Sequence, residues 1–108
     1  MRIESSRFYG MLGIAMRAGQ LKLGEFGVTQ AIAKGKAALV LVDESASPNT
    51  KKRIQDACVY RKIPLFETID GELSRASGKP DRMSAAVTAG SICTELLRLA
   101  CAEDDGKT

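Results

Sequence analysis

Histidine and tryptophan are absent from the 108-residue chain, and proline, cysteine and aromatic residues are few. Without histidine the chain has neither the usual general base nor a Ser-His or Cys-His nucleophile pair. The pair Asp43-Glu44, which is the remaining candidate for acid–base chemistry, is expected to end a strand in solvent. We therefore predict a protein that is not an enzyme and that needs no cofactor.

The three cysteines, Cys58, Cys93 and Cys101, include no C-x-x-C pair, so a zinc site is not expected and we read them as small apolar residues on helix faces. No apolar run is long enough to cross a membrane. The segment MRIESSRFYG lacks the apolar core of an export signal, so we expect a cytoplasmic protein.

The chain is mildly basic, with a formal net charge of +3 and a pI near 8.9. The final EDDGKT segment holds three of the 13 acidic residues and one of the 16 basic ones, so the remainder is more basic than the whole. This charge permits a polyanionic partner without requiring one.

Helical and strand patterns alternate along the chain. Their spacing, caps and stop signals predict helices from Ser5 or Ser6 to Gly19, from Gly24 to Gly35, after the cap and first-turn pair Ser47-Pro48, from the cap Asp70 to Gly78, and over Ile92–Ala100. Strands are predicted at residues 20–23, 37–42, 64–67 and 84–88.

This alternation, with the run Ala37–Val42 apolar on both faces, predicts a single α/β domain over residues 1–102. We expect a three-layer α/β/α sandwich with a four-stranded mixed sheet. Residues 103–108 are expected to form an acidic, flexible tail.

The segment GEFGVTQAIAKG, which begins at Gly24, has the glycine spacing of a ligand-binding turn. A phosphate loop is rejected because Glu25 and Phe26 replace the required Lys and Ser/Thr. The G-x-x-G loop of a KH domain is disfavoured, since a strand precedes the segment and Glu25 has the wrong charge. A helix N-terminus that offers free N–H groups to phosphates, and a plain strand-to-helix turn, both stay open.

Four segments carry a resemblance to a known family: Leu12–Gly24, Val28–Lys52, Cys58–Leu65 and Glu72–Lys79. In order, and over nearly the whole chain, they resemble the kink-turn RNA-binding ribosomal proteins of the archaeal seven-Ae and eukaryotic thirty-e type, and most of all the bacterial YlxQ-like branch. The resemblance implies an α/β/α sandwich that binds RNA in a ribosomal or translational setting.

The resemblance also implies where RNA binds. In the family the second helix begins with a pattern like G-x-N-E-x-x-K, whose Asn, Glu and Lys contact sheared G·A pairs in a bent RNA. Here Gly24 matches, but Phe26, Gly27 and Gln30 stand at those three positions. Glu25 could supply the carboxylate one position early. The implied RNA-binding residues are Lys22, Gly24, Glu25, Phe26, Gly27, Gln30, Lys34, Lys36, Lys79, Pro80 and Arg82, the last three from the family's second contact loop.

We therefore expect a monomer that binds structured RNA, with ribosomal RNA as one candidate, and that has no membrane or small-molecule partner. The alternative is a degenerate family member that acts as a protein-interaction module. Phe26 distinguishes these interpretations in part, because a buried ring indicates a merely structural turn and an exposed ring indicates a binding surface.

Overall fold

The structure, a computed structural model, describes the backbone of residues 2–106 and the side chains of residues 2–101. Helices and strands alternate along this part of the chain. Their order is β1 (Arg2–Ile3), α1 (Ser6–Arg17), β2 (Leu21–Leu23), α2 (Gly24–Ala33), β3 (Ala37–Asp43), α3 (Pro48–Arg61), β4 (Leu65–Thr68), α4 (Glu72–Ser77), β5 (Ser84–Thr88) and α5 (Ser91–Gly106).

The described strands form one mixed sheet in the order β1-β4-β3-β5-β2. The pairs β1/β4 and β3/β4 are parallel, whereas β3/β5 and β2/β5 are antiparallel. The predicted mixed sheet is confirmed, but the prediction of four strands was wrong because the sheet has five. The missed strand β1 has only two residues, which is too short for an alternating pattern to show.

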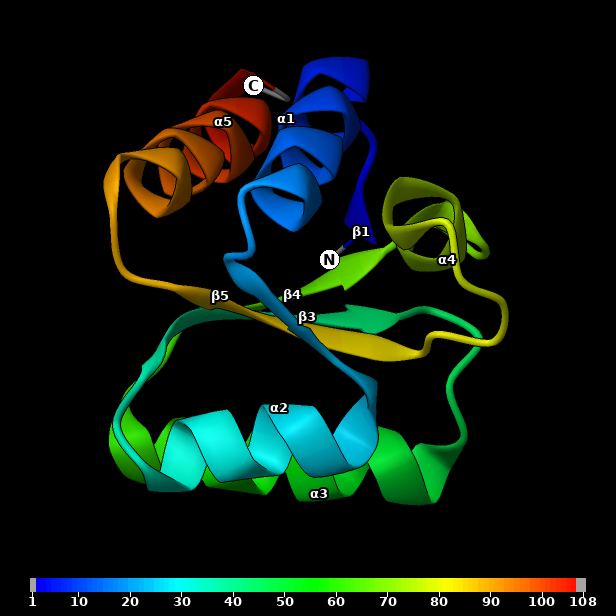
Figure 1. The fold of residues 1–108 in the computed structure, drawn as a ribbon, viewed down its shortest axis with the longest axis vertical. Coiled ribbons are helices and arrows are strands. Elements are labelled where there is room, and N and C mark those ends of the chain that lie inside the picture. Colours follow the sequence, from blue (N-terminus) through cyan, green and yellow to red (C-terminus); the bar gives the residue numbers. More distant parts are fainter. Residues whose placement is uncertain (1, 107–108) are drawn as a thin grey trace.

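Helices cover both faces of the sheet, with α1, α4 and α5 on one side and α2 and α3 on the other (Figure 1). Strand β3 packs against the helices on both faces of the sheet. Its Leu39 and Leu41 pack with residues of α1, α4 and α5, while Val40 and Val42 pack with residues of α2 and α3. The sheet is therefore buried on both faces, as the continuous apolar run predicted.

Two of the predicted helix N-caps are confirmed and one was wrong. The hydroxyls of Ser5 and Ser47 accept hydrogen bonds from backbone N–H groups in the first turns of α1 and α3. Asp70 does not cap α4. The N-cap is Gly71, whose φ of +87° a side chain would strain, and it makes no side-chain capping bond.

Cys58 and Cys93 are buried in the apolar layers, as predicted, whereas Cys101 is exposed on α5 and does not contribute to the core.

The predicted tail 103–108 starts inside α5, which continues to Gly106, and residues 107–108 lie outside the described residues. Its flexibility stays a prediction. Among the helices of the described chain, none combines the length and apolar character that a membrane span requires.

Candidate functional site

Strand β2 passes into helix α2 without a loop, and Gly24 makes this possible. Its φ of +82° lies in the left-handed region that favours glycine. The preceding residue, Leu23, is the N-cap and has no side chain that can accept a hydrogen bond. The first N–H groups of α2 therefore have no side-chain cap and can serve an anionic ligand.

Glu25 is directed toward α3. Its carboxylate accepts hydrogen bonds from Nε of Arg53, at 2.5 Å, and from the hydroxyl of Thr50, at 3.4 Å. The hydrogen bond from Arg53 holds the pKa of the Glu25 carboxyl below its usual value. The carboxylate is thus ionised and already paired, and its expected contact with RNA stays a prediction.

Phe26 and Gly27 occupy the first turn of α2 and leave it open to solvent. The Phe26 side chain is 75% exposed, so the interpretation of this segment as a merely structural turn loses its support. A Cβ added at Gly27 would meet only Lys22, at 3.9 Å, which is an ordinary contact distance. The surface here therefore has room for a ligand.

A hollow of about 210 Å³ lies along one flank of α2, from Gly27 to the C-cap residue Lys34. Five residues of the predicted site line it, together with Ala31: Lys22, Gly27, Gln30, Lys34 and Lys36. Strand β2, helix α2 and the connection to β3 each contribute at least one of them. The structure thus gathers these residues around one basic hollow.

The loop between α4 and β5 approaches the same turn of α2. Nη1 of Arg82 lies 3.6 Å from the position that a Cβ on Gly24 would occupy. Nε of Arg82 is buried and makes no hydrogen bond with the described residues. Lys79 and Pro80 are exposed on this loop. The guanidinium therefore lies beside the positive end of α2, where an anion would favour both.

The run Lys51-Lys52-Arg53 on α3 is not part of this hollow. Each of its side chains has an acidic partner: Lys51 pairs with Glu67, Lys52 with Asp56, and Arg53 with Glu25. This basic run is consequently a solvated, internally paired helix face.

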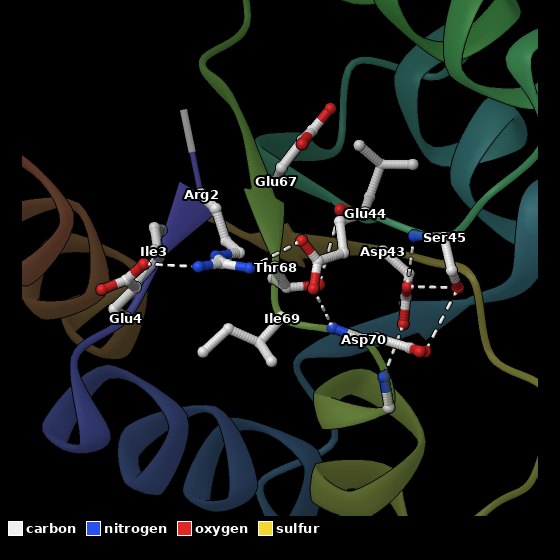
Figure 2. Close-up of polar contacts among 12 residues, drawn as sticks. Arg2, Ile3, Glu4, Asp43, Glu44, Ser45, Glu67, Thr68, Ile69 and Asp70 are labelled. Atoms are coloured by element: carbon white, nitrogen blue, oxygen red, sulfur yellow. Dashed lines mark hydrogen bonds and ion pairs between the residues drawn. The ribbon is translucent and has the colours of Figure 1, made fainter.

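Asp43, expected in solvent, is instead fully buried at the end of β3, so that prediction was wrong. Its carboxylate accepts hydrogen bonds from the N–H and the hydroxyl of Ser45, both at 2.7 Å, and from the N–H of Gly71 at 2.9 Å (Figure 2). Its own N–H donates to the carbonyl of Met83. Asp43 thereby fixes both ends of the segment that carries Arg82.

The neighbouring Glu44 adds a second set of bonds in Figure 2. Its carboxylate accepts from the N–H of Asp70 and from the guanidinium of Arg2, each at 2.9 Å. These two hydrogen bonds hold the pKa of Glu44 below its usual value, and the bond from the Asp70 N–H has the larger effect.

The described residues contain no group of three or more His, Cys, Asp or Glu that could hold a metal ion.

The family model described as "Ribosomal protein L7Ae/L30e/S12e/Gadd45 family" matches residues 6–97. RNA-binding protein YlxQ of Bacillus subtilis is 36% identical over 99 residues, which cover 90% of this chain and 98% of that protein. RNA-binding protein YlxQ of Enterococcus faecium is 38% identical over 81 residues, which cover 74% and 79%, respectively.

Two solved structures share the fold. A Bacillus halodurans protein of unknown function aligns with a TM-score of 0.84 and 32% identity, over 90% of this chain and 99% of that one. The 15.5kD RNA binding protein of Giardia lamblia aligns with a TM-score of 0.75 and 17% identity, over 93% and 92%. The second likeness concerns the fold alone.

Proposed function

The chain belongs to the ribosomal protein L7Ae/L30e/S12e/Gadd45 family, and from this premise we propose that it binds structured RNA at the start of α2. Its YlxQ relatives are named as RNA-binding proteins, and accordingly the chain is a binding protein and not an enzyme. We expect it to act as a monomer in the cytoplasm, with ribosomal RNA and kink-turn RNA among its candidate partners.

The observation that carries this proposal is the basic hollow along the flank of α2, which begins at Gly27, three residues after the start of the helix. Three of its lining residues, Lys22, Lys34 and Lys36, are exposed cations, and none of them forms an ion pair with the described residues. RNA phosphates are the partners that such unpaired cations favour. Free N–H groups at a helix N-terminus bind phosphate oxygens for the same electrostatic reason.

Arg82 supports the same position for a phosphate. Its buried Nε has no acceptor among the described residues, and a buried donor without an acceptor is costly. A phosphate between Arg82 and the first turn of α2 would provide that acceptor and would offset the repulsion between guanidinium and helix dipole. The missing side chain of Gly24 leaves the backbone accessible at this point.

Base recognition at this site differs from the pattern that the family resemblance implies. Phe26, Gly27 and Gln30 replace the Asn, Glu and Lys that contact sheared G·A pairs, and Glu25 is held by Arg53. We therefore propose recognition led by RNA shape and phosphates. In it, Phe26 stacks on an unpaired base and Gln30 hydrogen-bonds a base edge or a sugar.

The exposed ring of Phe26 also favours a second candidate function, in which this turn docks onto a protein partner. The substitution Phe26→Ala separates the two functions. On the RNA proposal it weakens RNA binding, because a stacked base is lost, whereas on the protein-docking alternative RNA affinity does not depend on the ring.

The proposal is tested by titration of a standard kink-turn RNA at several salt concentrations, in parallel with the same RNA whose G·A pairs are replaced. Phosphate contacts from Lys22, Lys34, Lys36, Lys79 and Arg82 predict that log affinity falls against log salt with a slope of about −3.5 to −4.5. Shape-led binding predicts similar affinity for the two RNAs.

Two charge-matched variants sharpen this test. Lys34→Ala is expected to flatten the salt slope by about 0.7–0.9, the value for one lost phosphate contact. Arg17→Ala removes the same charge from α1, on the opposite face of the sheet, and is expected to leave the slope unchanged. Absence of binding to either RNA at low salt, or equal effects of the two variants, would overturn the proposed site.

A further inference from the structure

An exposed aromatic residue, Tyr60, lies on the last turn of α3. Tyr60 is 82% exposed, more than any other large apolar residue whose side chain the structure describes, and the neighbouring Val59 is 69% exposed. The ring therefore contributes little to the core, which α3 reaches through Ile54 and Cys58 instead. A ring in this position is suited to contact with a partner.

Arg61 connects this ring with the basic hollow. Its guanidinium carbon lies 5.9 Å from the centre of the Tyr60 ring, within the range of a cation–π contact. Its Nη2 also donates to the carbonyl of Ala33 at 3.0 Å, at the end of α2. Lys34, which follows Ala33 directly, lines the hollow, so Arg61 and the hollow meet at the same end of α2.

The ends of α2 and α3, which the hydrogen bond from Arg61 connects, are basic. Lys34, Lys36, Arg61 and Lys62 are exposed, and none of them pairs with an acid of the described chain. The nearest preceding acid on α3, Asp56, is paired with Lys52. The carbonyl ends of α2 and α3 contribute a partial charge of about −0.5 each, which the four cations exceed.

We propose that Tyr60 and Arg61 form a stacking platform for an unpaired nucleotide of RNA that continues from the hollow beside α2. A base stacks on the Tyr60 ring next to the Arg61 guanidinium, while Lys34, Lys36 and Lys62 contact the flanking phosphates. This inference rests on the proposed RNA function. It adds a single-stranded segment to the RNA that the protein recognises.

The test compares a kink-turn RNA with the same RNA carrying a short oligouridine extension on its 5′ or its 3′ end. The full chain is expected to bind one of the extended RNAs more tightly than the unextended RNA. Tyr60→Ala is expected to remove this advantage, with an affinity loss of about 5- to 150-fold on the extended RNA, the range for one stacked base. Tyr60→Phe keeps the ring face and is expected to retain the advantage.

Val59→Ala is the matched control, because Val59 is similarly exposed on the same turn and is expected to leave the affinity for every RNA unchanged. If the extension adds no affinity, or if Tyr60→Ala binds the extended RNA as well as wild type does, the platform is overturned while RNA binding at α2 stands. If the wild-type chain binds none of these RNAs, the proposed function and the platform are both overturned.

Discussion

Restoring the family pattern at the start of α2 is predicted to create discrimination for G·A pairs. The variant carries Phe26→Asn, Gly27→Glu and Gln30→Lys. The structure indicates that all three changes are tolerated, because Phe26 is 75% exposed, Gln30 is exposed, and a Cβ at Gly27 has only ordinary contacts with Lys22, at 3.9 Å. Replacing glycine in a helix stabilises by about 0.5–1 kcal/mol, and an acidic residue in the first turn favours the helix dipole.

The expected gain follows from the contacts that Glu and Lys would make. By analogy with base readout in DNA, each bidentate contact contributes about 1–3 kcal/mol of discrimination. Two such contacts predict that the variant prefers intact kink-turn RNA over RNA with replaced G·A pairs by about 30-fold or more. Wild type is expected to show little preference.

The assay is a binding titration of both proteins against both RNAs, with thermal unfolding of each protein as the control for folding. A variant with unchanged or higher melting temperature that binds the two RNAs equally well would refute the reasoning. In that case the start of α2 would not face the G·A pairs of a bound RNA, whatever else the hollow contacts.

Four further predictions concern stability and reactivity. Gly24→Ala is expected to destabilise the fold by about 1–2 kcal/mol in urea unfolding, because its φ of +82° disfavours a side chain, and an unchanged midpoint would contradict this. Asp43→Ala, which leaves three partly buried donors without their acceptor, is expected to cost about 1–3 kcal/mol, and Asp43→Asn less. The pKa of Glu44 is lowered in the folded chain, so its contribution to stability is present at neutral pH and is lost below about pH 4; Glu44→Gln should lose less stability on acidification than wild type. Cys101 should react with iodoacetamide well before Cys58, whose burial raises its thiol pKa to about 11, and equal rates would contradict the packing.

The layers of the fold could be predicted because every element except β1 carried a local signal in the sequence. In the run Ala37–Val42, side chains that alternate between the two faces of β3 are all apolar, which only a sheet covered on both sides explains. Strand β1 could not be predicted, since its two residues are held by pairing with β4 and not by a local pattern. The cap at Asp70 was wrong because α4 begins one residue later, with Gly71 as its N-cap, and the Asp70 carboxylate instead accepts from the hydroxyl of Ser45, 25 residues away.

The candidate site was predictable in part. Gln30 stands at a position of the family pattern, Lys22 and Lys34 are basic residues that flank it in the sequence, and the structure brings all three to one hollow. Contacts between distant segments were not predictable. Neither the pairing of Glu25 with Arg53 on α3 nor the burial of Asp43 has a signal in the sequence, because both arise from how the layers come together.

Amide chemical shifts of the labelled protein, followed during titration with a kink-turn RNA, test the central claim most directly. The account predicts that the largest changes fall on Gly24–Gln30 and on Arg82, where the uncapped turn of α2 meets the loop before β5. The account is contradicted if the changes are concentrated on α1 and α5, on the opposite face of the sheet, or if no changes occur at low salt.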